Sequence, residues 1–175
     1  MTALEVYDLV TLGGGSDFAQ VIRVCESVGP YCLIGGLAVN CYVEPVYTVD
    51  ADLVVVLNQT PRLSELLAKN GFSIQTFEHS LNAQAMGSKL RIQFTTDPRY
   101  QNFPSRAQRQ TVLDTEVLVA CLEDVTKGKL WAYGDPTRRL SKRKKDELDL
   151  IRLAESFPEL KRTYPPGLVS MLDGL

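Results

Sequence analysis

Two aspartates, Asp50 and Asp52, lie two positions apart at the start of a short apolar run, residues 49–57. Because β-branched residues dominate this run, it predicts a strand, in which side chains alternate between faces and both carboxylates point the same way. Two aligned carboxylates repel each other unless a cation lies between them, and a hard divalent cation is the usual partner. The pair therefore predicts a site for Mg²⁺ or Mn²⁺ held by Asp50 and Asp52.

A pair of glycines, Gly35 and Gly36, follows the apolar segment 31–34 and precedes a helix-compatible segment, residues 37–42. This pattern predicts a strand, a tight turn and the start of a helix. Free backbone N–H groups at a helix start attract an anion, and glycine lets a phosphate come close to the backbone. Together with the two aspartates, the glycines predict a metal–triphosphate site.

The rest of the pattern predicts the elements that must position these residues. Apolar or alternating segments predict strands at residues 31–34, 49–57, 72–77, 89–95 and 111–119, the last with a turn at Asp114. Apolar stripes at helical spacing predict helices at residues 4–10, 16–28, 61–69, 122–133 and 138–156. We therefore expect a core of strands and helices over residues 1–119 and a helical part over residues 120–175, packed together as one compact unit.

The composition is that of a globular protein, with 45% apolar residues, 23% charged residues and a formal net charge of −2. This charge excludes a uniformly basic surface but permits a local basic patch. No apolar stretch approaches the ~20 residues of a membrane span, and no secretory signal is visible. The four cysteines lack Cys-x-x-Cys spacing and His79 is the single histidine, which argues against a zinc site. We expect reduced cysteines, a cytoplasmic location and no membrane partner.

A charged helix expected at residues 138–156 supplies further candidates. At about 100° per residue, Asp146 points in the same direction as the apolar Leu150 and Leu153. We therefore expect Asp146 to be buried and paired with a cation, either Lys129 or a neighbouring arginine. The alternative is a solvated basic helix start with local ion pairs. Upstream basic residues in the same direction are expected to attract phosphate: Arg139, Lys142 and Arg143.

Four segments of the chain occur in an order that is typical of one protein family. They are residues 33–40 (LIGGLAVN), 48–53 (TVDADL), 129–132 (KLWA) and 145–150 (KDELDL), with Arg138 and Arg139 between the last two. On these motifs the chain resembles the DNA polymerase β-like nucleotidyltransferases, and within them the AbiEii toxin-like branch. The resemblance extends over residues 31–153.

The resemblance implies an α+β fold, with a nucleotidyltransferase-like mixed β-sheet, helices packed against one face of it and a C-terminal helical part. It implies metal-dependent transfer of a nucleoside monophosphate from an NTP to an acceptor hydroxyl. The catalytic residues would be Asp50 and Asp52, which hold the metal, with Lys129 and Asp146. The residues that would hold the triphosphate are Gly35, Gly36, Thr48, Lys129 and Arg139. The implied partners are an NTP, a tRNA or another RNA end and, for the toxin of a toxin–antitoxin pair, a cognate antitoxin protein.

Two positions depart from the family pattern. Relatives commonly carry an arginine just ahead of the Thr-x-Asp-x-Asp segment, where this chain has Val46. Many also carry a third carboxylate on a neighbouring strand, where this chain has Gln93, which cannot be a charged metal ligand or a base. These departures leave open a catalytically degenerate module of the same fold that binds a nucleotide or a partner.

A small-molecule (antibiotic) nucleotidyltransferase is a further alternative. Such an enzyme would usually need an acidic pocket to bind a cationic drug. The sequence does not indicate that acidic residues other than Asp50 and Asp52 line such a pocket. Six of the eight residues 138–145 are instead basic, which favours a polyanionic acceptor such as RNA.

Overall fold

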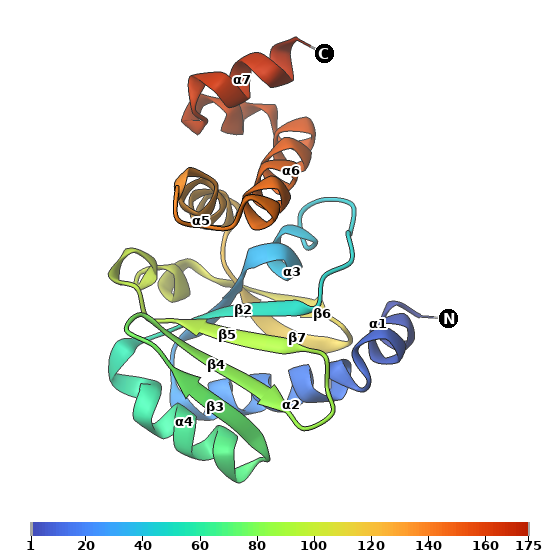
Figure 1. Cartoon of the computed structure of the whole chain (residues 1–175), viewed down its shortest axis with the longest axis vertical. Helices are drawn as coiled ribbons and strands as arrows, with labels where there is room; N and C mark the ends of the chain where they lie inside the picture. Colours follow the sequence, from blue (N-terminus) through green and yellow to red (C-terminus); the bar gives the residue numbers. More distant parts are fainter. Residues whose placement is uncertain (1, 175) are drawn as a thin grey trace.

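The computed structural model describes residues 2–174 and contains a mixed seven-stranded sheet with the strand order β3-β4-β5-β2-β1-β7-β6 (Figure 1). Two neighbouring pairs, β2–β5 and β1–β7, are parallel, and the other pairs are antiparallel. The strands are β1 (Tyr31–Ile34), β2 (Asp50–Val55), β3 (Phe72–Thr76), β4 (Ser80–Ala85), β5 (Arg91–Thr95), β6 (Gln108–Val112) and β7 (Thr115–Val119).

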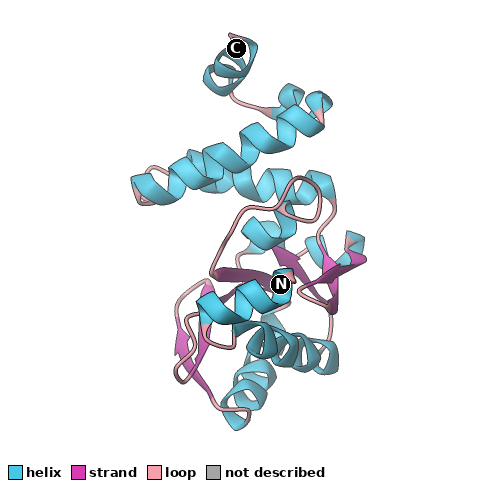
Figure 2. Ribbon diagram, turned by 90° about the vertical axis from the view of Figure 1, so that its right-hand side faces the viewer, coloured by secondary structure: helices cyan, strands magenta, loops and turns pink. Residues whose placement is uncertain are grey.

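Helices lie on both sides of this sheet (Figures 1 and 2). They are α1 (Ala3–Thr11), α2 (Gly14–Val28), α3 (Gly35–Val39), α4 (Thr60–Lys69), α5 (Leu122–Gly134), α6 (Leu140–Ser156) and α7 (Pro166–Asp173). α2 and α4 lie on one side, whereas α3, α5 and α6 lie on the other, with α7 at the far end (Figure 1). The C-terminal helices thus stand over the part of the sheet that carries the two aspartates.

Alternation along β3, β4 and β5 gives this part of the sheet one apolar and one polar face. Leu81 and Ala83 of β4 are buried, as are Ile92 and Phe94 of β5. These side chains belong to the core that includes residues of α2 and α4. The side chains at the intervening positions of β3, β4 and β5 are polar, and they face a cleft instead of the core.

Several details differ from the expectations. The strand expected at residues 111–119 is instead part of a hairpin, β6–β7. Its turn at Leu113 and Asp114 has positive φ at both positions (49° and 57°), the geometry of a tight type I′ turn. The sequence pattern does not predict β4, whose residues SLNAQA include no β-branched or aromatic side chain. It also does not predict α7, which begins at Pro166, where proline suits a first helical turn. Helices cover both faces of the sheet, not one.

The division of the chain expected after residue 119 stays a prediction. β7 ends at Val119 and α5 begins at Leu122, so the expected boundary after residue 119 lies between these two elements. Within residues 2–174, none of the helices combines the length and the apolar character that crossing a membrane requires.

Candidate active site

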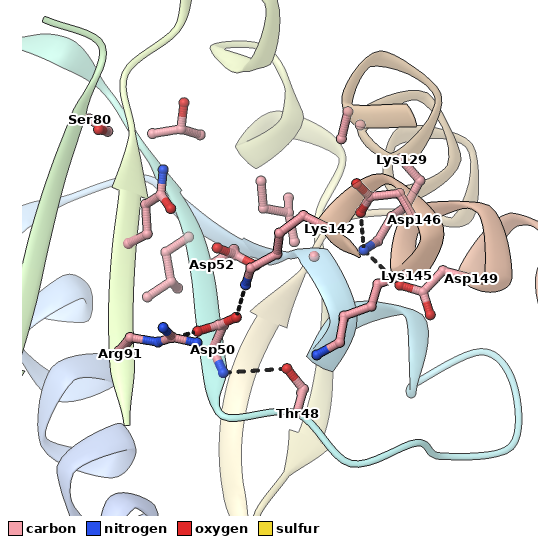
Figure 3. Close-up of a pocket in the computed structure, with 18 of the residues that line it drawn as sticks. Thr48, Asp50, Asp52, Ser80, Arg91, Lys129, Lys142, Lys145, Asp146 and Asp149 are labelled. Atoms are coloured by element: carbon pink, nitrogen blue, oxygen red, sulfur yellow. Dashed lines mark hydrogen bonds and ion pairs between the residues drawn. The ribbon is translucent and has the colours of Figure 1, made fainter. Parts of the chain in front are cut away.

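A cleft of about 740 Å³ opens between the polar face of the sheet and helices α5 and α6. Its walls come from the sheet strands, from the turn after β1 and from both helices, so it collects residues from distant parts of the sequence. Figure 3 shows Asp50 and Asp52 projecting from β2 toward Lys142 of α6. Ala51, between the two aspartates, is fully buried on the opposite face, as strand alternation requires.

Asp50 is held by two cations. Its Oδ1 accepts a hydrogen bond from Arg91 Nε at 2.7 Å, and its Oδ2 accepts one from Lys142 Nζ at 2.6 Å. Burial tends to raise the pKa of Asp50, but Lys142 and Arg91 outweigh it, and the pKa lies below the ordinary value for aspartate. Asp50 is therefore a carboxylate at neutral pH, and it links β2 to β5 and to α6.

Asp52 lies directly against the glycine turn. Gly35 has φ +70°, and a Cβ added there would lie 2.2 Å from Asp52 Oδ2. Both the backbone conformation and the aspartate therefore require glycine at this position. Burial raises the pKa of Asp52, against the opposing effect of Lys129. Among residues 2–174, no hydrogen bond or ion pair engages the Asp52 carboxylate, which leaves it available to a ligand.

Three further residues could contact the phosphates of a nucleotide. A Cβ added to Gly36 would lie 3.6 Å from the Thr48 side chain, an ordinary contact distance, so the position beside Thr48 is not filled. Lys145 lines the same cleft and forms no ion pair within residues 2–174. Figure 3 shows Lys145 and Thr48 on the same side of Asp50. α3 spans only five residues, so its helix dipole is weak. Binding of an anion here would therefore depend mainly on the glycine turn, Thr48 and Lys145.

Substitution of the two glycines separates the structural role of the turn from phosphate binding. We expect Gly36→Ala to keep the thermal stability of the protein but to weaken NTP binding at least about tenfold, because the methyl group occupies the space a phosphate would approach. Gly35→Ala should instead destabilise the fold by about 1–3 kcal/mol, because alanine is strained at positive φ and meets Asp52. Circular dichroism and calorimetric NTP titration measure both effects. Normal NTP binding by Gly36→Ala would show that the turn serves the fold alone.

A buried ion-pair network lies beside the aspartates, between α5 and α6. Lys129 Nζ donates to Asp146 Oδ1 at 3.0 Å and lies 2.6 Å from Asp149 Oδ2, and Arg138 Nε donates to Asp146 Oδ2 at 2.7 Å. Asp146 is only 1% exposed and pairs with both Lys129 and Arg138, so the expectation that it is buried and paired with Lys129 or a neighbouring arginine is confirmed. Burial alone would lower the pKa of Lys129, but Asp149 and Asp146 outweigh it and the net shift is upward. Lys129 therefore stays charged.

The same network holds the loop that leads into β2. Arg152 Nη1 donates to Asp149 Oδ1 at 2.7 Å, and its Nη2 donates to Asn40 Oδ1 at 3.1 Å and to the carbonyl oxygen of Glu44. The amide of Asn40 in turn exchanges hydrogen bonds of 2.7 Å and 3.0 Å with the backbone of Val46. Val46, at the position where the motif resemblance implies an arginine, contributes backbone groups to this network, and Arg152 of α6 supplies an arginine that contacts the same loop.

Gln93 stands directly beside Asp52, because the parallel register of β2 and β5 pairs the two residues. The position beside Asp52, where the family resemblance implies a third carboxylate, thus holds an amide. No group of three or more His, Cys, Asp or Glu residues that could hold a metal occurs within residues 2–174. Asp50 and Asp52 nevertheless fit Mg²⁺ or Mn²⁺, because such ions use one or two carboxylates together with phosphate oxygens and water. A bound metal would replace Arg91 and Lys142 at Asp50.

Seven of the eight nominated site residues line this cleft: Gly35, Gly36, Thr48, Asp50, Asp52, Lys129 and Asp146. The eighth, Arg139, is exposed at the N-cap of α6 and is not among the residues that line the cleft. Its neighbour Arg138 lines the cleft instead and binds Asp146. Arg143, which was expected to attract phosphate, donates to the carbonyl oxygen of Tyr133.

Sequence reasoning missed three contributors to this site. Arg91 pairs with Asp50 across β2 and β5, and only the strand register could have indicated it. Asp149 was visible in the KDELDL motif, three residues after Asp146 and so on the same helix face. Arg152 follows one turn later, but nothing in the local pattern predicts its contact with the distant loop.

Comparisons with known proteins find similarity in structure but not in sequence. No protein-family model and no curated protein sequence matches the chain. Solved structures do match it. ANT(2'')-Ia in complex with adenylyl-2''-tobramycin is 12% identical, with a TM-score of 0.60 over 92% of this chain and 97% of that one. The solution structure of ANT(2'')-Ia, an antibiotic-resistance factor, is also 12% identical, with a TM-score of 0.56 over 90% and 89%.

An antigenic nucleotidyltransferase-like protein from Paracoccidioides brasiliensis is 18% identical, with a TM-score of 0.52 over 91% of this chain and 92% of that one. The chain has the nucleotidyltransferase fold. At these identities the likeness concerns the nucleotidyltransferase fold alone, and the AbiEii-like branch stays a prediction from the motifs. The nucleotidyltransferase fold nevertheless accounts for the mixed sheet and for the helices that stand over β1 and β2.

Proposed function

We propose that the protein is a nucleotidyltransferase that moves a nucleoside monophosphate from an NTP to an acceptor hydroxyl. The observation that carries this proposal is the position of Asp50 and Asp52 on one face of β2. Asp52 lies against the Gly35 turn, and both aspartates line the cleft of a nucleotidyltransferase fold. In the reaction, the acceptor oxygen bonds to the α-phosphorus, the bond from that phosphorus to the bridging oxygen breaks, and pyrophosphate leaves. The hydroxyl proton passes to water.

The side chains of the cleft divide this work. Asp50 and Asp52 would hold Mg²⁺ or Mn²⁺, which supplies positive charge to the phosphates when bound. Gly36, Thr48 and Lys145 would contact the triphosphate. Lys145 would supply a compact positive charge there. Lys129 is held rigidly by two carboxylates and contributes a fixed positive charge to the wall that Asp146 supports.

We propose an RNA end as the acceptor, with tRNA as the first candidate. The run of basic residues at 138–145 supports a polyanionic partner. The motif resemblance to the AbiEii toxin-like branch supports a role as the toxin of a toxin–antitoxin pair in the cytoplasm, with a cognate antitoxin as protein partner. Growth arrest on expression, relieved by the product of a neighbouring gene, would test that role.

Nucleotide binding and transfer are tested in sequence. We expect the protein to bind at least one NTP more tightly with Mg²⁺ than without it, because the metal shields the phosphates from the carboxylates. Incubation with α-labelled NTPs and total RNA should then label an RNA species, which gel electrophoresis detects. NTP binding with no labelled product would favour the second candidate, a degenerate nucleotide-binding module, which Gln93 beside Asp52 supports.

A further inference from the structure

Four side chains form a row across the open face of the sheet. The strand registers pair Gln75 with Asn82, Asn82 with Gln93, and Gln93 with Asp52. Neighbours in such a row lie about 5 Å apart. We refer to Gln75, Asn82 and Gln93 as the amide row. It leads away from Asp52 on the side opposite the Gly35 turn, because β1, which precedes that turn, is the other neighbour of β2.

The protein leaves the hydrogen-bonding capacity of the amide row unused. Among residues 2–174, no hydrogen bond engages the side chains of Gln75, Asn82 or Gln93, and Asn82 Oδ1 is buried without a partner. All three residues line the cleft, and Gln75 and Gln93 are exposed in it. Each amide offers two donors and an acceptor. The amide row therefore suits a ligand that is uncharged and rich in hydrogen-bonding groups.

The carboxylates of the cleft argue against a polycationic ligand. Six aspartates line the cleft, and four of them already form ion pairs with lysine or arginine: Asp50, Asp97, Asp146 and Asp149. The other two are Asp52, next to the glycine turn, and Asp135, which accepts hydrogen bonds from Thr137. A polycation needs several carboxylates that are free to pair, and the amide row supplies none.

We propose that the amide row is the acceptor site, and that it binds a nucleoside whose base and ribose carry the hydrogen-bonding groups. This inference rests on the proposed transfer reaction and names its acceptor chemistry. Asparagine and glutamine pair well with base edges, and unstacked bases are recognised through such hydrogen bonds. A ribose hydroxyl of the bound nucleoside then lies toward Asp52, between the amide row and the glycine turn. Its oxygen bonds to the α-phosphorus of the NTP as pyrophosphate leaves.

Direct binding tests this assignment without requiring transfer. Three probes are titrated separately into the full chain and followed by saturation-transfer NMR: adenosine, a short single-stranded RNA with a free 3′-hydroxyl, and the polycation tobramycin. Magnesium and a non-transferable NTP analogue are present, so that the nucleotide side is filled. We expect adenosine or the RNA to bind, and Asn82→Leu and Gln75→Leu to weaken that binding at least about tenfold through lost hydrogen bonds. The variants should bind the NTP analogue as tightly as the parent does.

Gln108→Leu is the matched control, because Gln108 is an exposed strand glutamine at the other edge of the sheet. Much tighter binding of the RNA than of adenosine identifies an RNA terminus as the acceptor, and equal binding identifies a free nucleoside. Parental binding of both probes by Asn82→Leu and Gln75→Leu, or preferential binding of tobramycin, would overturn the assignment. If the unmutated protein does not bind the NTP analogue, the proposed transfer function is contradicted. The assignment of the amide row is judged separately, by whether Asn82→Leu and Gln75→Leu weaken the binding of adenosine or RNA.

Discussion

Asp52→Asn is expected to abolish nucleotide transfer, with a loss of at least about a thousandfold in kcat/KM, the scale of removing an electrostatic group at the reacting atoms. The fold should be as stable as the parent or more stable. Burial raises the pKa of Asp52, so the folded state holds this proton more tightly than the unfolded chain does. Stability linked to Asp52 is therefore present at low pH and falls as pH rises from the unfolded to the folded pKa. Because the asparagine of Asp52→Asn does not ionise, the variant avoids this loss of folding stability at pH 7.

Transfer kinetics and thermal unfolding at pH 7 measure the two effects of Asp52→Asn together. Asp135→Asn is the matched control, because Asp135 lines the same cleft and its hydrogen bonds to Thr137 can be kept by an asparagine. The control should retain activity. Parental activity in Asp52→Asn would exclude a catalytic role for this carboxylate, and an unfolded Asp52→Asn protein would indicate a structural one.

Lys129→Ala is expected to cause the largest loss of stability, on the order of 3–5 kcal/mol. Lys129 is 9% exposed and contacts both Asp146 and Asp149, so its removal takes a cation from two buried carboxylates. Asp146→Ala should cost less, because Lys129 keeps Asp149 and the other freed cation, Arg138, is partly exposed. Both variants should also lose activity, since the network fixes one wall of the cleft. Urea denaturation gives the free energies of unfolding.

A double-mutant cycle tests whether these charges act together. Lys129→Ala with Asp146→Ala should cost less than the sum of the single variants, because the double variant no longer leaves Asp146 without its lysine. Glu147→Ala is the control, and it should change stability by about 1 kcal/mol or less, because within residues 2–174 Glu147 pairs only with the exposed Lys144. If Asp146→Ala were as mild as Glu147→Ala, the network would not stabilise the fold.

The site was predictable where one element defines the geometry. Strand alternation places Asp50 and Asp52 on one face, and the glycine pair marks the turn that meets Asp52. The helical wheel predicts the burial of Asp146, because it lies in line with Leu150 and Leu153, which are both fully buried. These inferences depend only on the periodicity of residues within one strand or helix, and this periodicity is visible in the sequence.

The remainder depends on contacts between elements that are distant in the sequence. The sequence cannot tell that Arg138 lines the cleft and pairs with Asp146, whereas Arg139, at the N-cap of α6, does not line the cleft. β4 is not predicted from the sequence, because its residues have low strand propensity. It is stabilised instead by pairing with β3 and β5 and by the burial of Leu81 and Ala83. Its place in the sheet is what creates the amide row.

The contact of Arg152 with the loop before β2 bears on the order in which the chain folds. Arg152 lies 112 residues after Asn40 and 108 residues after Glu44, so these contacts have a high sequence separation. Contacts of this kind form late, because a long segment of chain must first be closed. During synthesis the sheet strands leave the ribosome well before α6. We therefore expect a nascent chain in which α6 has not yet folded, or a chain truncated before α6, to lack a fixed approach to Asp50.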